Sequence, residues 1–366
     1  MSTAKEQWDT YLKTELPKIT ALLSPYHITL DAEQPHTKGE RFLMQALTTV
    51  GGKKLILLGT KTTTNERVVI KATNDVIGTE ELTHERACRT LLHSMRFSYE
   101  SFHSPKEVLF LKKSGYTIFV SEFIEQTSSF LERPLAVQFS YALRALKAQE
   151  RTRATTSSHF KIIGRVFGNR TADNYLTMFD AFLHTVKTST PSERTLSALT
   201  VARTRLQAGK AHIEQYGGFL THTDFVPHNF RIKDDTLYLL DFSSLRFGNK
   251  HESWARFLNF MTLYNRDLEM LLLEYVTNNR AKEEQESLTL MRLFRLGEII
   301  AYYTGTLAKS TDNLRKLNDA RIVFWTEVLT AELAGSRVSD DIVETYKHTR
   351  DTLRSDDEKK RQVGLH

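Results

Sequence analysis

The chain has 366 residues, of which 40% are hydrophobic and 26% are charged, and its formal net charge is +6. This balance is typical of a soluble globular protein, and the length allows one large domain or two lobes. The single cysteine, Cys88, excludes an intramolecular disulfide and any site built from several cysteines.

Segment 1–17 lacks the apolar core of a signal peptide, and the apolar stretch 288–307 is interrupted by Arg292, Arg295 and Glu298. We therefore expect a cytoplasmic protein that does not cross a membrane.

The first third of the chain combines helical and extended patterns. Apolar residues recur at helical spacing over 4–23 and again over 78–95. Alternating apolar residues, separated by turn-forming residues, predict five short strands at 41–47, 55–62, 67–72, 107–112 and 116–123. In chain order these are three strands, a helix and two strands. We expect them to form a first domain, 1–124, built around an antiparallel sheet.

The remainder of the chain, 125–366, is predicted to be a second and mainly helical domain. Helical periodicity is clearest over 135–147, 171–187, 193–216 and 253–276. One β-hairpin interrupts these helices, with strands at 230–232 and 236–240 and a turn at Lys233, Asp234 and Asp235. The expected fold class is therefore α+β, with a five-stranded antiparallel lobe and a helical lobe that carries a hairpin.

The strongest motif lies beside this hairpin and reads His222-Thr223-Asp224-Phe225-Val226-Pro227-His228-Asn229, followed later by Asp241. Phosphoryl transfer needs a carboxylate that orients the acceptor hydroxyl and a magnesium ion that neutralises the triphosphate. Asp224 suits the first task, and Asn229 and Asp241, joined by the short hairpin, offer hard oxygen ligands for Mg²⁺. A single match of this kind also arises by chance, because Asp and Asn are common in turns.

The spacing H-x-D-x-x-x-x-N with a later Asp at a strand end resembles the catalytic core of the protein-kinase-like superfamily. It is more closely similar to the aminoglycoside phosphotransferase and choline kinase branch, whose loop commonly reads His-Gly-Asp-x-x-x-x-Asn, often with the proline found here as Pro227. This chain has Thr223 in place of the Gly, and it lacks the Arg that follows the His in protein kinases. The resemblance implies a bilobal protein-kinase-like fold, ATP and Mg²⁺ as cofactors, and a scaffold role for His222.

A second group of candidate residues lies in the N-terminal lobe. Strand alternation places Val69 and Lys71 on one face, and the resemblance implies that Val69 packs on adenine while Lys71 holds the α and β phosphates. Taken alone, Lys71 would more often be a solvated strand lysine. Glu85 shares an apolar helix face with Cys88 and therefore needs a cation, which makes it the expected partner of Lys71. Glu81, one turn earlier, is the alternative partner.

The strand 116–123 ends in Glu122-Phe123-Ile124-Glu125, where the extended pattern gives way to a helical one. This resembles the hinge between kinase lobes, where the carbonyl of Glu122 and the amide of Ile124 would bond the edge of adenine. An ordinary strand end explains the pattern equally well. The turn at 48–52 occupies the place of the phosphate-covering loop, but it lacks G-x-G-x-x-G and is equally a simple hairpin turn.

The chain departs from the family pattern after Asp241. No Ala-Pro-Glu sequence follows, which disfavours protein substrates. Ser253-Trp254-Ala255 stands where small-molecule kinases often have Asp-Leu-Ala, and Glu252 is a candidate to replace the missing Asp. A run of cations without any Asp or Glu forms either a solvated loop or a lid for an acidic substrate or partner: Arg151, Arg153, Lys161, Arg165 and Arg170.

We therefore expect a small-molecule kinase that moves the γ-phosphoryl group of ATP to a hydroxyl of an aminoglycoside, a choline-like alcohol, a sugar or an amino acid. The alternative is a pseudokinase that binds ATP and presents its helical lobe to a partner. A basic nucleic-acid binder is disfavoured, because interleaved aromatics and recognised binding motifs are missing. The sequence leaves open the acceptor, the choice between ATP and GTP, and the oligomeric state.

Overall fold

The computed structural model describes residues 4–37, 53–94, 103–153, 157–189, 191–356 and 359. The chain forms two compact units. The first contains Met1–Arg89, His103–Thr127 and Arg231–Ser243. The second contains Thr90–Phe102, Ser128–Phe230 and Ser244–His366. These units are defined by their packing, and the expected domains 1–124 and 125–366 stay a prediction.

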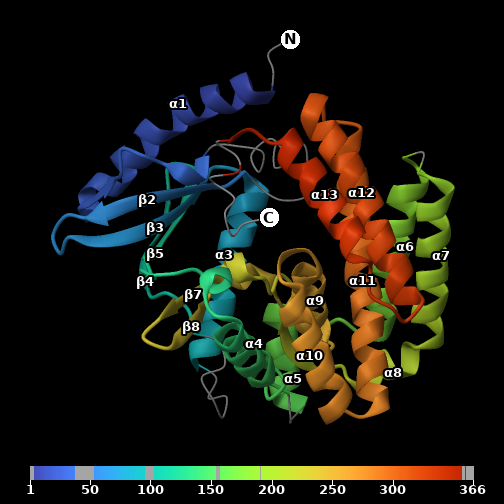
Figure 1. Ribbon diagram of the computed structural model, residues 1–366. Helices are drawn as coiled ribbons and strands as arrows, with labels where there is room; N and C mark the ends of the chain where they lie inside the picture. The colour runs from blue at the N-terminus through green and yellow to red at the C-terminus, as the bar shows by residue number, and fades with distance from the viewer. Residues whose placement is uncertain are drawn as a thin grey trace. The chain divides into compact units, whose positions relative to one another are not determined.

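The first unit contains a five-stranded antiparallel sheet (Figure 1), as predicted. Its strand order is β1-β2-β3-β5-β4, with β1 at Ile28–Leu30, β2 at Leu55–Lys61, β3 at Glu66–Thr73, β4 at Glu107–Lys113 and β5 at Tyr116–Glu122. The predicted strand 41–47 and turn 48–52 lie outside the described residues. The prediction did not include β1, because three residues are too few to establish an alternation.

Helix α1, Ala4–Leu23, covers one face of this sheet (Figure 1). Its Ile19 and Leu23 pack in a core with strand residues that include Val68, Ile70, Ala72, Ile118 and Val120. Because side chains alternate along a strand, Val69 and Lys71 of β3 point to the opposite face. Helix α3, Val76–Ser94, begins where the side chain of Asp75 accepts a hydrogen bond from the Gly78 amide at 2.9 Å.

The predicted hairpin consists of β7, Phe230–Lys233, and β8, Thr236–Leu239. Its turn residues Asp234 and Asp235 have φ values of 48° and 59°. Left-handed conformations at two central residues are the requirement of a tight two-residue turn, and Asp is one of the few side chains that tolerates them.

The second unit is mostly helical, with α4 at Leu135–Gln149, α5 at Ser157–Phe167, α6 at Ala172–Lys187, α7 at Glu193–Ala208, α8 at Lys210–Gln215, α9 at Glu252–Tyr264, α10 at Arg266–Asn279, α11 at Lys282–Leu307, α12 at Asp312–Leu333 and α13 at Asp340–Leu353. The long helix α11 packs against α6, α7, α9 and α12 (Figure 1). This arrangement confirms the predicted helical part of the fold.

Two of the predicted helices are each divided into two. The helix predicted at 193–216 breaks at Gly209, where a Cβ atom would lie 2.4 Å from Leu290 Cδ1 of α11. The helix predicted at 253–276 breaks at Asn265, whose side chain accepts the Leu268 amide and caps α10. In both places a packing or capping contact overrides continuous helical periodicity.

A short antiparallel pair of strands, β6 at Phe219–His222 and β9 at Leu245–Gly248, was not predicted. His222 pairs with Leu245, and the Thr223 amide donates to the Ser244 carbonyl at 2.9 Å. This pair therefore joins the two ends of the segment that carries the motif and the hairpin.

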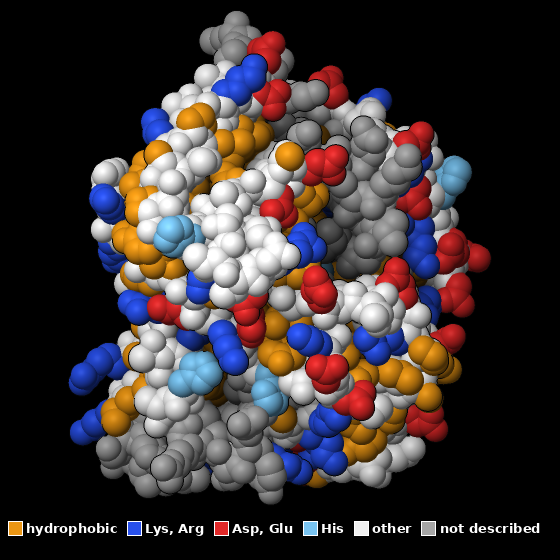
Figure 2. Space-filling model, turned by 90° about the vertical axis from the view of Figure 1, so that its left-hand side faces the viewer, with side chains coloured by type: hydrophobic (Ala, Val, Ile, Leu, Met, Phe, Trp, Pro, Cys, Tyr) orange, Lys and Arg blue, Asp and Glu red, His pale blue; other side chains and the backbone are white. Residues whose placement is uncertain are grey.

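None of the helices in the described part of the chain combines the length and the apolar run needed to span a membrane. Figure 2 shows one face of the molecule, on which Lys and Arg side chains lie interspersed with Asp and Glu side chains. Among the described side chains of this face, positive charge does not form the continuous stripe typical of a nucleic-acid groove.

Candidate active site

In the first unit, Lys71 of β3 forms an ion pair with Glu85 of α3. Its Nζ lies 2.8 Å from Oε1 and 2.7 Å from Oε2 of that carboxylate. The Glu85 side chain is 3% exposed and the Lys71 side chain 19% exposed, so the pair has limited solvent contact. Strand alternation places it on the sheet face opposite α1. The alternative acid, Glu81, pairs with Lys54 instead.

Strand β5 lies between β3 and β4, and backbone hydrogen bonds hold its end on both sides. The Phe123 amide donates to the Arg67 carbonyl at 3.1 Å, which attaches this segment to β3. The Glu122 amide donates to the Lys106 carbonyl, and its side chain accepts the Lys106 amide at 2.8 Å. Within the described residues, the Ile124 amide has no hydrogen-bond partner. This N–H group can therefore donate to another molecule beside β3, the strand that carries Val69 and Lys71.

Asp241 follows the hairpin in the same unit. Its φ of 56° places the residue in the left-handed region, and Ser243 Oγ donates to its Oδ1 at 2.6 Å. The next residue, Phe242, packs against Arg89 of α3, whose guanidinium lies 5.5 Å from that ring and 5.1 Å from the Phe119 ring. Phe119 is the register partner of Lys71. The segment that carries Asp241 therefore packs on α3, the helix of Glu85, through an arginine that also contacts β5, the strand paired with β3.

In the second unit, the Asp224 carboxylate is held by three neighbours. Arg256 of α9 donates from Nε at 3.0 Å and from Nη2 at 2.8 Å to Oδ1. Asn229 Nδ2 donates to Oδ2 and to the Asp224 carbonyl, each at 2.9 Å. His228 Nε2 lies 3.7 Å from Oδ2. With 31% of its side chain exposed, Asp224 can still be reached from solvent.

These contacts decide the charge of Asp224. Burial by itself would raise the pKa of the carboxyl group, but Arg256 and His228 outweigh burial and hold this pKa well below its usual range. Asp224 is therefore ionised at neutral pH and can accept a hydrogen bond from a hydroxyl group.

Asn229 presents an oxygen atom suited to a metal ion. Because its amide nitrogen donates to Asp224, its Oδ1 is directed elsewhere, and this atom has no partner among the described residues. An amide oxygen and the Asp241 carboxylate are the hard donors that Mg²⁺ prefers. The described part of the chain contains no group of three or more His, Cys, Asp or Glu that could hold a metal. Each of these two oxygens, taken within its own unit, is of the type that a magnesium ion accepts.

Helix α9 supports the motif through Ser253. His222 is fully buried, and its amide donates to Ser253 Oγ at 2.9 Å. The same hydroxyl lies 2.6 Å from Gln149 Oε1. Glu252, the candidate to replace the missing Asp, instead pairs with Arg170 and Tyr175, each at 2.6 Å. Ser253 makes the contact with the loop.

The basic run 151–170 is divided in the structure. Arg170 is 16% exposed and forms an internal ion pair with the fully buried Glu252, so the run is not unopposed. Arg153 packs over the Phe219 ring at 5.5 Å, and Lys161 and Arg165 are exposed on α5. Arg170 is therefore a structural residue and not part of a lid.

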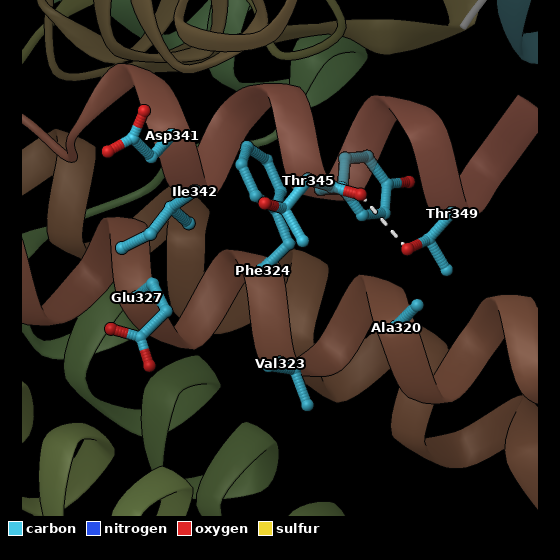
Figure 3. A pocket seen from close by; sticks show the side chains of 9 residues that line it. Ala320, Val323, Phe324, Glu327, Asp341, Ile342, Thr345 and Thr349 are labelled. Carbon is cyan, nitrogen blue, oxygen red and sulfur yellow. Dashed lines mark hydrogen bonds between the residues drawn. The ribbon is translucent and has the colours of Figure 1, made fainter.

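A groove of about 500 Å³ lies between α12 and α13 (Figure 3). Apolar side chains, among them Phe324 and Ile342, line much of it together with Tyr346, and the carboxylates of Glu327 and Asp341 lie at one end. None of the residues predicted for the active site lines this groove, so it is separate from the candidate site.

Sequence reasoning missed Arg256 and the contact of His228 with Asp224. The signal for Arg256 was present, because Phe260 and Leu263, four and seven residues later on α9, share its helix face and are buried. A cation in an apolar helix stripe needs an anionic partner, just as the Glu85 carboxylate needs a cation.

Comparison with solved structures reveals the same fold in antibiotic phosphotransferases. A thermostable mutant of aminoglycoside phosphotransferase APH(4)-Ia aligns with 81% of this chain and 99% of its own, at a TM-score of 0.56 and 12% identity. The GDP complex of aminoglycoside 2′-phosphotransferase-IIIa aligns with 91% of this chain and 99% of its own, at a TM-score of 0.55 and 16% identity. Macrolide 2′-phosphotransferase from Brachybacterium faecium aligns with 84% and 98%, at a TM-score of 0.50 and 11% identity.

No protein-family model and no curated protein matches the chain by sequence. The structural matches confirm the predicted resemblance and fold class, since the matched fold is that of the protein-kinase-like aminoglycoside phosphotransferases.

Proposed function

We propose, from the fold that this chain shares with aminoglycoside and macrolide phosphotransferases, that it transfers the γ-phosphoryl group of ATP to a hydroxyl of a small molecule. The observation that carries the proposal is the Asp224 carboxylate, which is ionised, partly exposed and bound to Asn229 at the spacing of the H-x-D-x-x-x-x-N motif. A carboxylate in this state can orient a hydroxyl group for attack on phosphorus.

The first unit would bind the nucleotide. Lys71, held by Glu85, would contact the α and β phosphates, because a fixed ammonium offsets their charge without reorganising. Val69 lies on the same strand face and would pack on adenine. The carbonyl of Glu122 and the Ile124 amide, which lacks a partner in the described part of the chain, would bond its polar edge.

Asn229 and Asp241 would hold Mg²⁺, which neutralises the triphosphate charge when it is bound. Asp224 would accept a hydrogen bond from the acceptor hydroxyl and fix its oxygen toward the γ-phosphate. His222 would keep the loop in place through the Ser253 hydroxyl. In this step the acceptor oxygen forms a bond to the γ-phosphorus while the bond between that phosphorus and the bridging oxygen of ADP breaks. The proton of the acceptor hydroxyl is released to solvent, so atoms and charge balance.

The acceptor class is proposed from the structural neighbours and from the missing Ala-Pro-Glu sequence. Among these neighbours are complexes with ADP and hygromycin B, and with GDP and kanamycin. An aminoglycoside, a choline-like alcohol, a sugar or an amino acid is the first set of acceptors to test, with ATP and GTP compared as donors.

The test is ADP release from Mg-ATP by the purified protein, measured across a panel of hydroxyl-bearing metabolites and antibiotics. We expect at least one acceptor to raise ADP release above the rate with water, and Asp224→Asn to abolish that increase. Asp180→Asn is the matched control, because Asp180 is a 54% exposed carboxylate that pairs with Arg203 on the surface. Nucleotide binding without turnover would contradict the proposal and favour a nucleotide sensor.

A further inference from the structure

We propose that Arg256 is a positioning residue for phosphoryl transfer, which fixes one oxygen of Asp224 so that the other oxygen receives the acceptor hydroxyl. This inference rests on the proposed function, and it adds a residue that lies outside the H-x-D-x-x-x-x-N motif. It is carried by the hydrogen bonds around Asp224 and by the way in which α9 holds the loop.

The hydrogen bonds make the two oxygens of Asp224 unequal. Oδ1 accepts from two N–H groups of Arg256, at 3.0 and 2.8 Å, which occupies its two lone-pair directions. Oδ2 accepts one short hydrogen bond, from Asn229 at 2.9 Å, and its second neighbour is the His228 ring, with Nε2 at 3.7 Å. The remaining lone pair for a hydroxyl group is therefore on Oδ2, and Arg256 decides which oxygen this is.

Arginine suits this task better than lysine would. The planar guanidinium presents its N–H groups in a fixed fork, so two of them converge on Oδ1, and together with the bond from Asn229 to Oδ2 they fix the rotation of the carboxylate. The Arg256 side chain is 16% exposed, which limits its freedom to turn toward solvent. A lysine at the same position would keep the charge but would supply no fixed pair of donors.

Helix α9 holds the motif at two points. Ser253 accepts the amide of His222, and Arg256, three residues later, binds the side chain of Asp224. Residues three apart lie on the same face of a helix, so one rigid element supports both the start and the reactive carboxylate of the loop. The neighbours of Arg256 on α9, Ala255 and Phe257, are fully buried and anchor this turn of the helix.

The loss of a positioning contact affects turnover more than nucleotide binding. Misplacement of a reacting group by about 1 Å can lower a rate by about 100-fold. The residues proposed to bind nucleotide lie in the first unit, whereas Arg256 lies in the second. We therefore expect kcat to fall and the KM for ATP to stay close to its wild-type value.

The experiment compares Arg256→Ala, Arg256→Gln and Arg256→Lys with wild type, using ADP release from Mg-ATP with water and with each panel compound. We expect kcat to fall about 100-fold in the Ala and Gln variants and less in the Lys variant. Guanidinium ion, at a concentration that leaves the melting temperature unchanged, is expected to restore part of the activity of Arg256→Ala. In an Asp224→Asn background, Arg256→Ala is expected to cause no further loss.

Arg203→Ala is the matched control. Arg203 also donates from Nε and Nη2 to a carboxylate, that of Asp180, but on the surface between α7 and α6. We expect this variant to keep wild-type kcat. If Arg256→Ala and Arg256→Gln also keep wild-type kcat, the positioning role is overturned while the proposed function stands.

Folding and total activity distinguish failure of the positioning role of Arg256 from failure of the proposed phosphotransferase function. Loss of folding in all three Arg256 variants, or activity loss that guanidinium cannot restore in a folded Arg256→Ala protein, would show a structural role and overturn the inference. A folded wild-type protein that releases no ADP under any condition would overturn the proposed function, and with it the role of Arg256.

Discussion

Lys71 and Glu85 meet across β3 and α3 in the first unit, with the ammonium 2.7 and 2.8 Å from the two carboxylate oxygens. The acid is nearly buried and the lysine is partly exposed. A buried carboxylate costs free energy unless a cation offsets it, so the pair fixes the direction of the lysine side chain. This fixed ammonium is the feature that the proposed nucleotide site depends on.

We predict that Glu85→Gln weakens nucleotide binding. Loss of the charged partner frees the Lys71 side chain, and a hydrogen bond to a charged group contributes about 1.5–3 kcal/mol, so we expect the Kd for Mg-ATP to rise at least roughly tenfold. Glu81→Gln is the control, because Glu81 pairs with Lys54. Titration of both variants with Mg-ATP, followed by thermal melting, measures the effect. Equal affinities in the two variants would contradict the assigned role of Glu85.

Ser253 offers a test of how the loop is supported. Ser253→Ala removes a hydroxyl that contacts the His222 amide and Gln149, and it leaves a buried donor without its partner. We expect a loss of about 1–3 kcal/mol in the free energy of unfolding, measured by urea titration, together with a lower kcat. Thr200→Ala, on an exposed part of α7, should leave both quantities unchanged. Wild-type stability in Ser253→Ala would show that the loop has another support.

Glu252 and Arg170 should behave as a structural pair. Glu252 is fully buried, and removal of its charge leaves Arg170 and Arg295 without their common partner. Breaking a buried ion pair costs about 3–5 kcal/mol, so Glu252→Gln should be strongly destabilised in chemical denaturation. Arg165→Gln, which changes an exposed cation of the same basic run, should unfold at the wild-type urea concentration. A mild effect of Glu252→Gln would argue against this structural assignment of Arg170.

His251 makes stability depend on pH. Burial, together with Lys250 and Arg280, lowers the pKa of His251 well below its usual value, while Ser287 and Glu284 of α11 lie 3.0 and 3.9 Å from its ring nitrogens. The unfolded chain binds a proton at this residue below about pH 6.5, and the folded protein does not. The folded state therefore loses stability as pH falls below that value, by up to about 1.4 kcal/mol per pH unit from this group.

The measurement is the free energy of unfolding at several pH values between neutral and mildly acidic. Wild type should lose more stability than His251→Gln over this range, because the variant lacks the titrating ring. Parallel pH profiles for the two proteins would mean that His251 protonates equally well in the folded and unfolded states.

Long elements were predictable from the sequence, and very short ones were not. The periodicity over 4–23 predicted α1 with its observed bounds, and the hairpin turn at Asp234 and Asp235 was predicted from its residue types. Strands β1, β6 and β9 have three or four residues, which is too few for alternation to distinguish a strand from a loop. Their pairing depends on contacts distant in the sequence.

Within the candidate site, the sequence was most informative where a charge stands in an apolar pattern. A carboxylate within the apolar stripe of α3 predicted that Glu85 faces Lys71. The same pattern, a cation within the apolar stripe of α9, marks Arg256. It could not choose between Glu252 and Ser253, because adjacent helical residues point about 100° apart and the face that meets the loop depends on tertiary packing. Arg170 was misread as a free cation because its partner lies 82 residues later in the chain.

The most direct test of the proposed function is to detect the phosphorylated product. Purified wild-type protein and Asp224→Asn are incubated with Mg-ATP and the acceptor that most increases ADP release, and the acceptor is then analysed by mass spectrometry. The proposal predicts a phosphate monoester of the acceptor with wild type, in an amount equal to the extra ADP, and none with Asp224→Asn. Extra ADP without a phosphorylated acceptor, or equal product from both proteins, would contradict it.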